Sequence, residues 1–293
     1  MTTLLLVRHG LTATTGHVLT GWTPGISLDD RGRAQAAALA ARLAPLPLDA
    51  IVSSPLERCQ QTAEAIAATR DGQPVLTEDR LGECHYGDWT GKPLKKLARE
   101  QLWRVVQAHP SAVTFPGPEG ESMSGMQHRA VAAVREWNAR LGPNATYLIC
   151  SHGDVIKAIV ADSLGLHLDQ SQRIQADPCS LTVIRYTPMR PFLVRMNDRG
   201  GGMDDLMPRN GHGRGGAASD AAVGGGSGGA DGADPATPAD PATPADPPGA
   251  GDPTAHGAQR ADEQDRRPVV VSPSSSSPSS LPSGRQQSAD TRG

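Results

Sequence analysis

The chain has 293 residues and a formal net charge of −3, with 28 Lys and Arg against 31 Asp and Glu. Because the positive and negative side chains nearly balance, the net charge gives no reason to expect a nucleic acid or a membrane surface as a partner. A small anionic substrate is still compatible with it, because a few local arginines can bind one without changing the overall charge.

The composition divides the chain into two parts. Residues 199–293 contain no Phe, Trp, Tyr, Ile or Lys, and they include an Ala-Asp-Pro near-repeat and runs of Gly, Ser and Pro. Such a segment buries too little apolar surface to offset roughly 1 to 2 kcal/mol of backbone entropy per residue. We therefore predict one folded domain over residues 1–198 and a disordered tail over residues 199–293, which leaves contacts of the tail with unknown partners open.

The cysteines and the N-terminus give no sign of a metal site or an export signal. The four cysteines are far apart, with no Cys-x-x-Cys pair and no His at zinc-binding spacing. The first apolar run, Leu4 to Val7, meets Arg8 at once and is too short for a signal peptide or a membrane span. We expect reduced thiols, no metal, and a soluble cytoplasmic protein.

Strand and helix signals alternate along the first 198 residues. The continuous apolar run of Thr2–Val7 predicts a buried strand. A helix begins at Asp30 and is ended by Pro45 and Pro47. The same reasoning predicts a strand over Asp49–Ser53, a helix from Ser53-Ser54-Pro55 to Ala68, a strand over Pro74–Leu76, helices over Leu94–Ala108 and Ser122–Leu141, a strand over Tyr147–Cys150, a helix over Asp154–Leu164, and strands over Ser180–Tyr186 and Phe192–Met196.

This alternation predicts an α/β fold, a three-layer sandwich in which helices flank a mainly parallel central sheet. Sheets of this kind bind ligands at the carboxyl ends of their strands. Three predicted strand ends carry polar residues: Arg8-His9-Gly10, Ser53-Ser54 and Ser151-His152-Gly153. We expect these three segments to converge.

The side chains at these positions suit a phosphoryl group. Arg58 lies about one helical turn in from Pro55, where the helix N-terminus and a guanidinium both favour an anion. A dianionic phosphoryl group would offset the repulsion between two arginines and a charged His152, which at an effective dielectric of 20 is about 4 kcal/mol per pair of charges 4 Å apart. Glu83, in the loop LGECHYGDWTG, fits the role of a proton donor to the leaving oxygen.

The order of the motifs LLLVRHG, LTGW, LDDRGRAQA, SSPLERCQQTA, LGECHYGDWTG, PEGES and SHG resembles that of the histidine phosphatase superfamily, also called the phosphoglycerate mutase-like family. The resemblance covers Leu4–Asp198. It implies that His9 is a nucleophile that forms a phosphohistidine and that Arg8, Arg58 and protonated His152 surround the phosphoryl group. It also implies that Glu83 donates and accepts the proton and that no metal or other cofactor is needed.

The resemblance also suggests further contacts with the phosphate and the substrate. It implies that the following residues line the pocket: Gly10, Thr15, Thr20, Gly21, Tyr86 and Gly153. Two positions depart from the family pattern, since Leu11 replaces the usual Glu and Thr15 replaces the usual Asn. A threonine hydroxyl still donates one hydrogen bond, so we expect a weaker contact at Thr15.

The phosphatase reaction on a small phosphorylated metabolite is the favoured prediction. Cofactor-dependent phosphoglycerate mutases carry an extra segment with an arginine pair after the ERHYG-like motif, and here the stretch between that motif and FPGPEGES has only Arg99 and Arg104. The motif sequence ECHYG nevertheless resembles that of the mutases, so a phosphoglycerate mutase-type phosphomutase is the alternative. A third hypothesis is a non-catalytic phospho-ligand binding module. The presence of Glu83 argues against it, because binding alone does not need a proton donor. A homodimer is possible, and no motif names the substrate.

Overall fold

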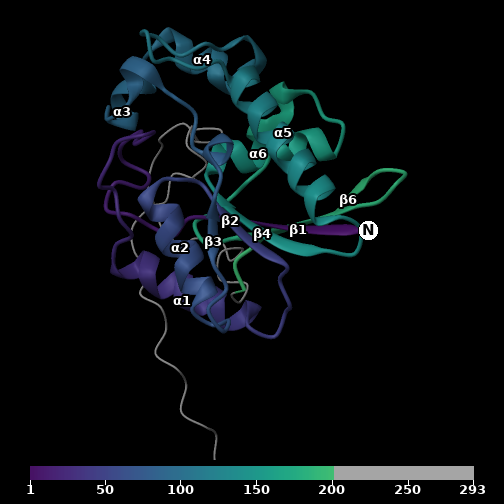
Figure 1. Cartoon of the computed structure of the whole chain (residues 1–293). Helices are drawn as coiled ribbons and strands as arrows, with labels where there is room; N and C mark the ends of the chain where they lie inside the picture. The colour runs from purple at the N-terminus through teal and green to yellow at the C-terminus, as the bar shows by residue number, and fades with distance from the viewer. Residues whose placement is uncertain (201–293) are drawn as a thin grey trace, which may run out of the picture. The chain divides into compact units, whose positions relative to one another are not determined.

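The computed structural model of the protein describes residues 1–200, which form a six-stranded sheet flanked by helices (Figure 1). The strand order is β3-β2-β4-β1-β5-β6. The strands are β1 (Thr2–Arg8), β2 (Ala50–Ser53), β3 (Val75–Thr77), β4 (Thr146–Ser151), β5 (Leu181–Tyr186) and β6 (Pro191–Asp198). The first four are parallel to one another, whereas β5 and β6 add an antiparallel edge. The predicted mainly parallel sheet is confirmed; most of the predicted tail, from residue 201, lies outside the described residues.

Six α-helices and four short 3-10 helices connect the strands within residues 1–200. The α-helices are α1 (Asp30–Leu43), α2 (Glu57–Ala67), α3 (Leu94–Leu97), α4 (Gln101–Ala108), α5 (Met123–Leu141) and α6 (Gly153–Ser163), and the 3-10 helices are η1 (Asp79–Leu81), η2 (Gly87–Trp89), η3 (Pro110–Ala112) and η4 (Leu168–Arg173). Helices α1 and α2 cover one face of the sheet, and α5 and α6 cover the other (Figure 1).

Strand β1 shows why the predicted apolar run is continuous. Leu4 and Leu6 pack into the hydrophobic cluster of α5 and α6, and Leu5 and Val7 pack into that of α1 and α2. Because successive strand residues point to opposite faces, a strand covered on both sides needs apolar residues at every position. Full burial of each of these side chains contributes about 1.5 to 3 kcal/mol relative to exposure.

Two predicted helices differ from the observed ones. Helix α2 begins at Glu57 rather than at the Ser53-Ser54-Pro55 segment, and Leu56 caps it without a side-chain hydrogen bond. The Ser54 hydroxyl instead lies 2.8 Å from Nε2 of His152. The single helix expected over Leu94–Ala108 is two helices, α3 and α4, because the extended backbone of Glu100 interrupts it.

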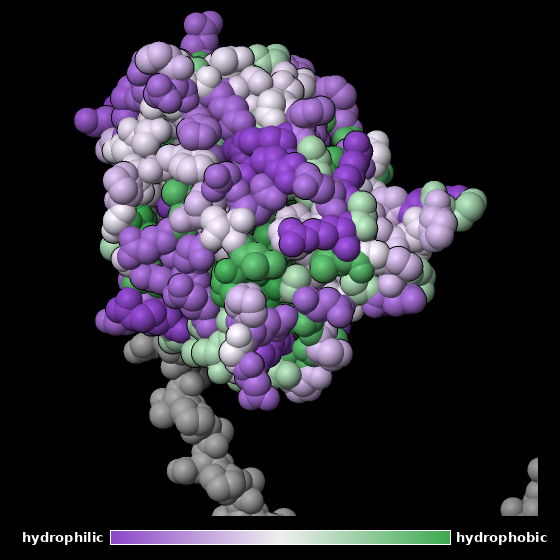
Figure 2. Space-filling model, in the orientation of Figure 1, coloured by the Kyte–Doolittle hydropathy of each residue, from purple (hydrophilic) through white to green (hydrophobic). Residues whose placement is uncertain are grey.

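The strand order decides where the polar segments meet. Strand β4 lies between β1 and β2 and is parallel to both, so the carboxyl ends of the three strands are adjacent. The face of the protein seen in Figure 2 is largely hydrophilic, with one group of hydrophobic residues near its middle. In residues 1–200 no helix has the length and apolar content needed to cross a membrane.

Candidate active site

Backbone hydrogen bonds join the three strand ends directly. The amide of His9 donates to the carbonyl of Ser151 over 3.0 Å, and the amide of Ser54 donates to the carbonyl of Cys150 over 2.9 Å. The turns after β1 and β2 are therefore both anchored to the end of β4. This brings together the side chains of three segments that are far apart in the sequence.

The ring of His9 is buried and held in one orientation. Its Nδ1 lies 2.8 Å from the carbonyl oxygen of Gly10, and Nε of Arg58 donates to its Nε2 over 3.3 Å. Because a carbonyl only accepts, the hydrogen is on Nδ1 and a lone pair remains on Nε2. Burial, followed by the charges of Arg58 and Arg8, lowers the pKa of His9 well below its ordinary value. The ring is thus neutral at neutral pH, as a nucleophile requires.

Arg58 is the central cation of the site. One of its Nη atoms donates to the carbonyl of Gly21 over 3.0 Å and lies 3.2 Å from Nδ1 of His152. Arg8 extends from the end of β1, and its Nη1 donates to the carbonyl of Ala176 over 2.8 Å. Within residues 1–200, Arg8 and Arg58 are the only buried arginines.

His152 accepts a hydrogen bond on one side of its ring and donates one on the other. Arg58 only donates, so Nδ1 of His152 is the acceptor, and the hydrogen on Nε2 points to the Ser54 hydroxyl at 2.8 Å. Burial and then Arg58 hold the pKa of His152 well below its ordinary value. In the site without a ligand, two arginines and burial therefore disfavour a third positive charge, and the protonated His152 expected beside a bound phosphoryl group stays a prediction.

The carboxyl group of Glu83 lies beside His152. Its Oε2 is 4.0 Å from Nδ1 of His152, its Oε1 accepts from the amide of Cys84 over 3.0 Å, and the residue is 4% exposed. Burial, followed by the charge of Asp154, raises the pKa of Glu83 to about 7, while Arg58 and Arg8 oppose the shift. At neutral pH this carboxyl can both give and take a proton.

Residues that the sequence did not single out hold the Glu83 loop. Arg129 of α5 donates to the carbonyls of Glu83 and Gly82 over 2.9 and 2.8 Å and forms a two-point ion pair with Glu121. The indole of Trp22 also donates to the carbonyl of Glu83. Arg129 is 46 residues from Glu83 in the sequence, and no local pattern relates the two.

The predicted glycines lie where the backbone approaches the rest of the site closely. The amide of Gly10 donates to the hydroxyl of Thr62 over 3.1 Å, and a Cβ on Gly10 would lie 2.7 Å from the carbonyl oxygen of Gly32. Gly21 has a φ of +52° in addition to its carbonyl contact with Arg58. Gly153 is the first residue of α6.

The remaining predicted pocket residues have partners within the protein. The hydroxyl of Thr15 accepts from the amide of Thr12 over 3.0 Å, and that of Thr20 lies 3.1 Å from the hydroxyl of Thr14. Tyr86 is fully buried, and its hydroxyl donates to Asp154 over 2.8 Å. Contacts of Thr15, Thr20 and Tyr86 with a substrate remain predictions.

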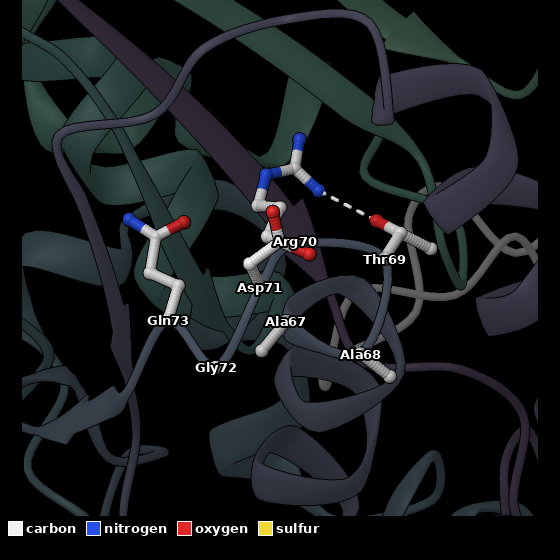
Figure 3. Close-up of a pocket in the computed structure, with 7 residues that line it drawn as sticks. All are labelled: Ala67, Ala68, Thr69, Arg70, Asp71, Gly72 and Gln73. Atoms are coloured by element: carbon white, nitrogen blue, oxygen red, sulfur yellow. Dashed lines mark hydrogen bonds between the residues drawn. The ribbon is translucent and has the colours of Figure 1, made fainter.

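A separate open hollow lies at the other end of α2 from Arg58, lined by residues 67–73 (Figure 3). Arg70 occupies it and donates to the carbonyls of Ile66 and Leu43, near the ends of α2 and α1, and to the hydroxyl of Thr69. This arginine joins two helix C-termini, so the hollow is a structural feature. In residues 1–200 no group of three or more His, Cys, Asp or Glu side chains is arranged to hold a metal ion.

Comparison with known proteins identifies the family. Residues 4–199 match the histidine phosphatase superfamily (branch 1). The chain belongs to this family. It is 31% identical over 208 residues to phosphoserine phosphatase 1 of Hydrogenobacter thermophilus, an alignment that covers 67% of this chain and 92% of that protein.

Two further relatives show the range of the similarity. The chain is 27% identical to 2,3-bisphosphoglycerate-dependent phosphoglycerate mutase 2 of Gloeobacter violaceus, over 61% of this chain and 83% of that one. The solved structure of Bacillus stearothermophilus YhfR superposes with a TM-score of 0.61 and 29% identity, over 68% of this chain and 98% of that one. The predicted family and fold are therefore confirmed, and the relatives include both a phosphatase and a mutase.

Proposed function

We propose that this member of the histidine phosphatase superfamily is a phosphatase that hydrolyses a small phosphomonoester through a phosphohistidine on Nε2 of His9. The observation that carries the proposal is the hydrogen bond between Nδ1 of His9 and the carbonyl of Gly10, because it leaves the lone pair of Nε2 facing Arg58. A neutral imidazole beside a buried guanidinium suits attack on an anion that the guanidinium binds.

In the first half-reaction, Nε2 of His9 attacks the phosphorus while the bond to the ester oxygen breaks. Arg8, Arg58 and His152 surround the transferred group and stabilise the charge on its equatorial oxygens. Glu83, protonated at the start, gives its proton to the leaving oxygen. The dianion brings the negative charge that the free site lacks, and this favours uptake of a proton by His152 on binding.

In the second half-reaction, the Glu83 carboxylate takes a proton from a water molecule as that water attacks the phosphohistidine. The bond between nitrogen and phosphorus breaks, inorganic phosphate leaves, and Glu83 is again protonated. A pKa of about 7 for Glu83 suits both steps, because neither the acid nor the base form is costly to reach at neutral pH.

The distribution of buried arginines favours a phosphatase over a mutase. A mutase that moves a phosphoryl group on phosphoglycerate must also bind the second anionic end of its substrate. In residues 1–200 the two buried arginines are both assigned to the phosphoryl group, and Arg99 and Arg104 are exposed. The mutase relative from Gloeobacter violaceus keeps a phosphomutase as the second candidate.

The proposal extends to the substrate, the oligomeric state and the location. A small phosphorylated metabolite as substrate fits a site whose side chains are buried and gathered around one phosphoryl group. A homodimer stays a prediction, for which the exposed apolar side chains of Phe192, Val194 and Met196 on edge strand β6 offer a contact surface. The cytoplasmic location and contacts of the tail also stay predictions.

An assay with p-nitrophenyl phosphate tests the proposal. Wild-type protein should release phosphate between pH 5 and 8 and, after acid-free quenching, carry acid-labile phosphate that is absent from His9→Ala. Binding of phosphate without turnover or phosphoenzyme would instead support a binding module. In a second assay, 3-phosphoglycerate with a bisphosphoglycerate primer should yield inorganic phosphate; formation of 2-phosphoglycerate would identify a mutase.

A further inference from the structure

A buried carboxylate that the proposed mechanism does not use lies beside the proposed catalytic groups. Asp154 is in the first turn of α6, two residues after His152, and it is 1% exposed. Its Oδ2 accepts a hydrogen bond of 2.8 Å from the hydroxyl of Tyr86, which is fully buried. Because Tyr86 is three residues after Glu83, this bond ties α6 to the loop that carries the proton donor.

A buried lysine accompanies this carboxylate. Lys157 lies one turn further along α6, is 2% exposed, and has its Nζ 3.8 Å from Oδ1 of Asp154. The same Nζ donates to the side-chain oxygen of Gln172 over 3.1 Å. Burial lowers the pKa of Lys157 while the charge of Asp154 opposes that shift. Two charges with so little exposure are costly to bury, and mutual pairing lowers that cost.

The mechanism sets an electrostatic problem at Glu83. The two arginines that bind the phosphoryl group favour the ionised form of this carboxyl, yet the first half-reaction needs its protonated form. Burial helps to keep the proton, and a nearby negative charge does so as well. The ionisable groups around Glu83 are Arg8 from β1, Arg58 from α2, His152, Asp154 and Lys157 from β4 and α6, Cys84 and Tyr86 from its own loop, and Arg129 of α5, which donates to the Glu83 carbonyl and pairs with Glu121.

We propose that Asp154 is a positioning residue that makes Glu83 hold its proton beside the two arginines, and that Lys157 limits this effect. The inference rests on the proposed role of Glu83 as proton donor. Removal of the negative charge lets the arginines dominate, so Glu83 loses its proton at a lower pH. Removal of the positive charge leaves Asp154 less balanced, so Glu83 holds its proton to a higher pH.

A purely structural role for Asp154 makes a different prediction. A carboxylate in the first turn of a helix stabilises the helix through its dipole, and its loss would lower stability. Loss of the Tyr86 hydrogen bond would do the same. Neither effect moves a pH profile in opposite directions when Asp154 and Lys157 are replaced in turn.

The test is the pH dependence of kcat/KM for β-glycerophosphate, an alkyl ester whose leaving oxygen needs a proton. The basic limb should move down by about one pH unit in Asp154→Asn and up by about half a unit in Lys157→Met. The double variant, which buries neither charge, should fall between the two single variants, about half a unit below wild type. Asp162→Asn is the matched control, since it makes the same substitution in α6 at a surface ion pair with Arg135.

The outcomes separate this inference from the proposed function. If the basic limbs of the kcat/KM profiles of both single variants coincide with that of wild type, or move in the same direction, the proposed role of Asp154 is overturned. If Asp154→Asn does not fold, Lys157→Met and the double variant still test the sign. A ¹³C NMR titration of the Glu83 carboxyl measures the same shifts without turnover, so an inactive wild type, or an unchanged limb in Glu83→Gln, would count against the proposed function alone.

Discussion

The hydroxyl of Ser54 and Nε2 of His152 lie 2.8 Å apart, which joins the end of β2 to the end of β4 through side chains as well as backbone. Because Arg58 donates to Nδ1 of His152, the hydrogen is on Nε2 and is directed to the Ser54 hydroxyl. The ring is thereby oriented before any substrate binds. Ser54 was expected at the edge of the site but not as one of its functional residues.

Replacing Ser54 by Ala should lower kcat/KM by about tenfold, since the loss of one hydrogen bond to a buried group costs about 1 to 3 kcal/mol. KM and kcat for p-nitrophenyl phosphate measure the effect. Ser163→Ala is a matched control, because it removes a buried hydroxyl that bonds only to a carbonyl within α6. An equal loss in both variants would contradict an orienting role for Ser54.

The guanidinium group of Arg58 contacts His9, Gly21 and His152 at the same time. A lysine keeps the charge but not this geometry, so Arg58→Lys should lower kcat by about 10² to 10³. Steady-state kinetics with p-nitrophenyl phosphate are the measurement. Arg135→Lys, at the surface, should leave kcat unchanged. Near wild-type activity in Arg58→Lys would show that charge alone suffices.

Glu83 should make the protein less stable as the pH rises. Its folded-state pKa of about 7 lies above the ordinary 4.5, so the folded state binds more protons between these values and loses stability as the pH rises through them. Glu83→Gln removes this cost and should raise stability relative to wild type by about 3 kcal/mol at pH 8 and by less than about 1 kcal/mol at pH 5. Thermal melts of both proteins at the two pH values test this. An identical difference in Tm at both would refute it.

The same residue should show its catalytic role through the leaving group. Glu83→Gln should slow hydrolysis of β-glycerophosphate far more than the first half-reaction with p-nitrophenyl phosphate, whose leaving group needs little protonation. Single-turnover rates of phosphoenzyme formation with the two esters give the comparison. Equal slowing for both would argue that Glu83 acts on structure, and no slowing for either would confine it to the water step.

Arg70 should matter for stability and not for catalysis. Arg70→Met leaves the carbonyls of Leu43 and Ile66 without the guanidinium and should lower the free energy of unfolding by about 1 to 3 kcal/mol. Urea unfolding measures this, and kcat should not change because the hollow is at the opposite end of α2 from Arg58. Arg135→Met, an exposed ion-pair residue, should cost less than about 1 kcal/mol.

The sequence by itself determined the alternation of strands and helices, the mainly parallel sheet and the ordered motifs of the family. It could do so because a strand buried on both faces must be apolar throughout, as in β1, and because helix ends carry Pro, Gly and capping residues. The cluster of His9, Arg58, Glu83 and His152 was also expected, since parallel strands place their carboxyl ends on one edge.

The tertiary structure alone decided how those residues act on one another. Strand order places β4 between β1 and β2, which no local pattern encodes. The hydrogen bond from Arg129 to the carbonyl of Glu83 joins residues 46 positions apart, and the bond from Tyr86 to Asp154 joins residues 68 positions apart. The protonation states follow from this packing, because burial and neighbouring charges set a pKa and neither is visible in a linear sequence. His152 is neutral in the free site for that reason.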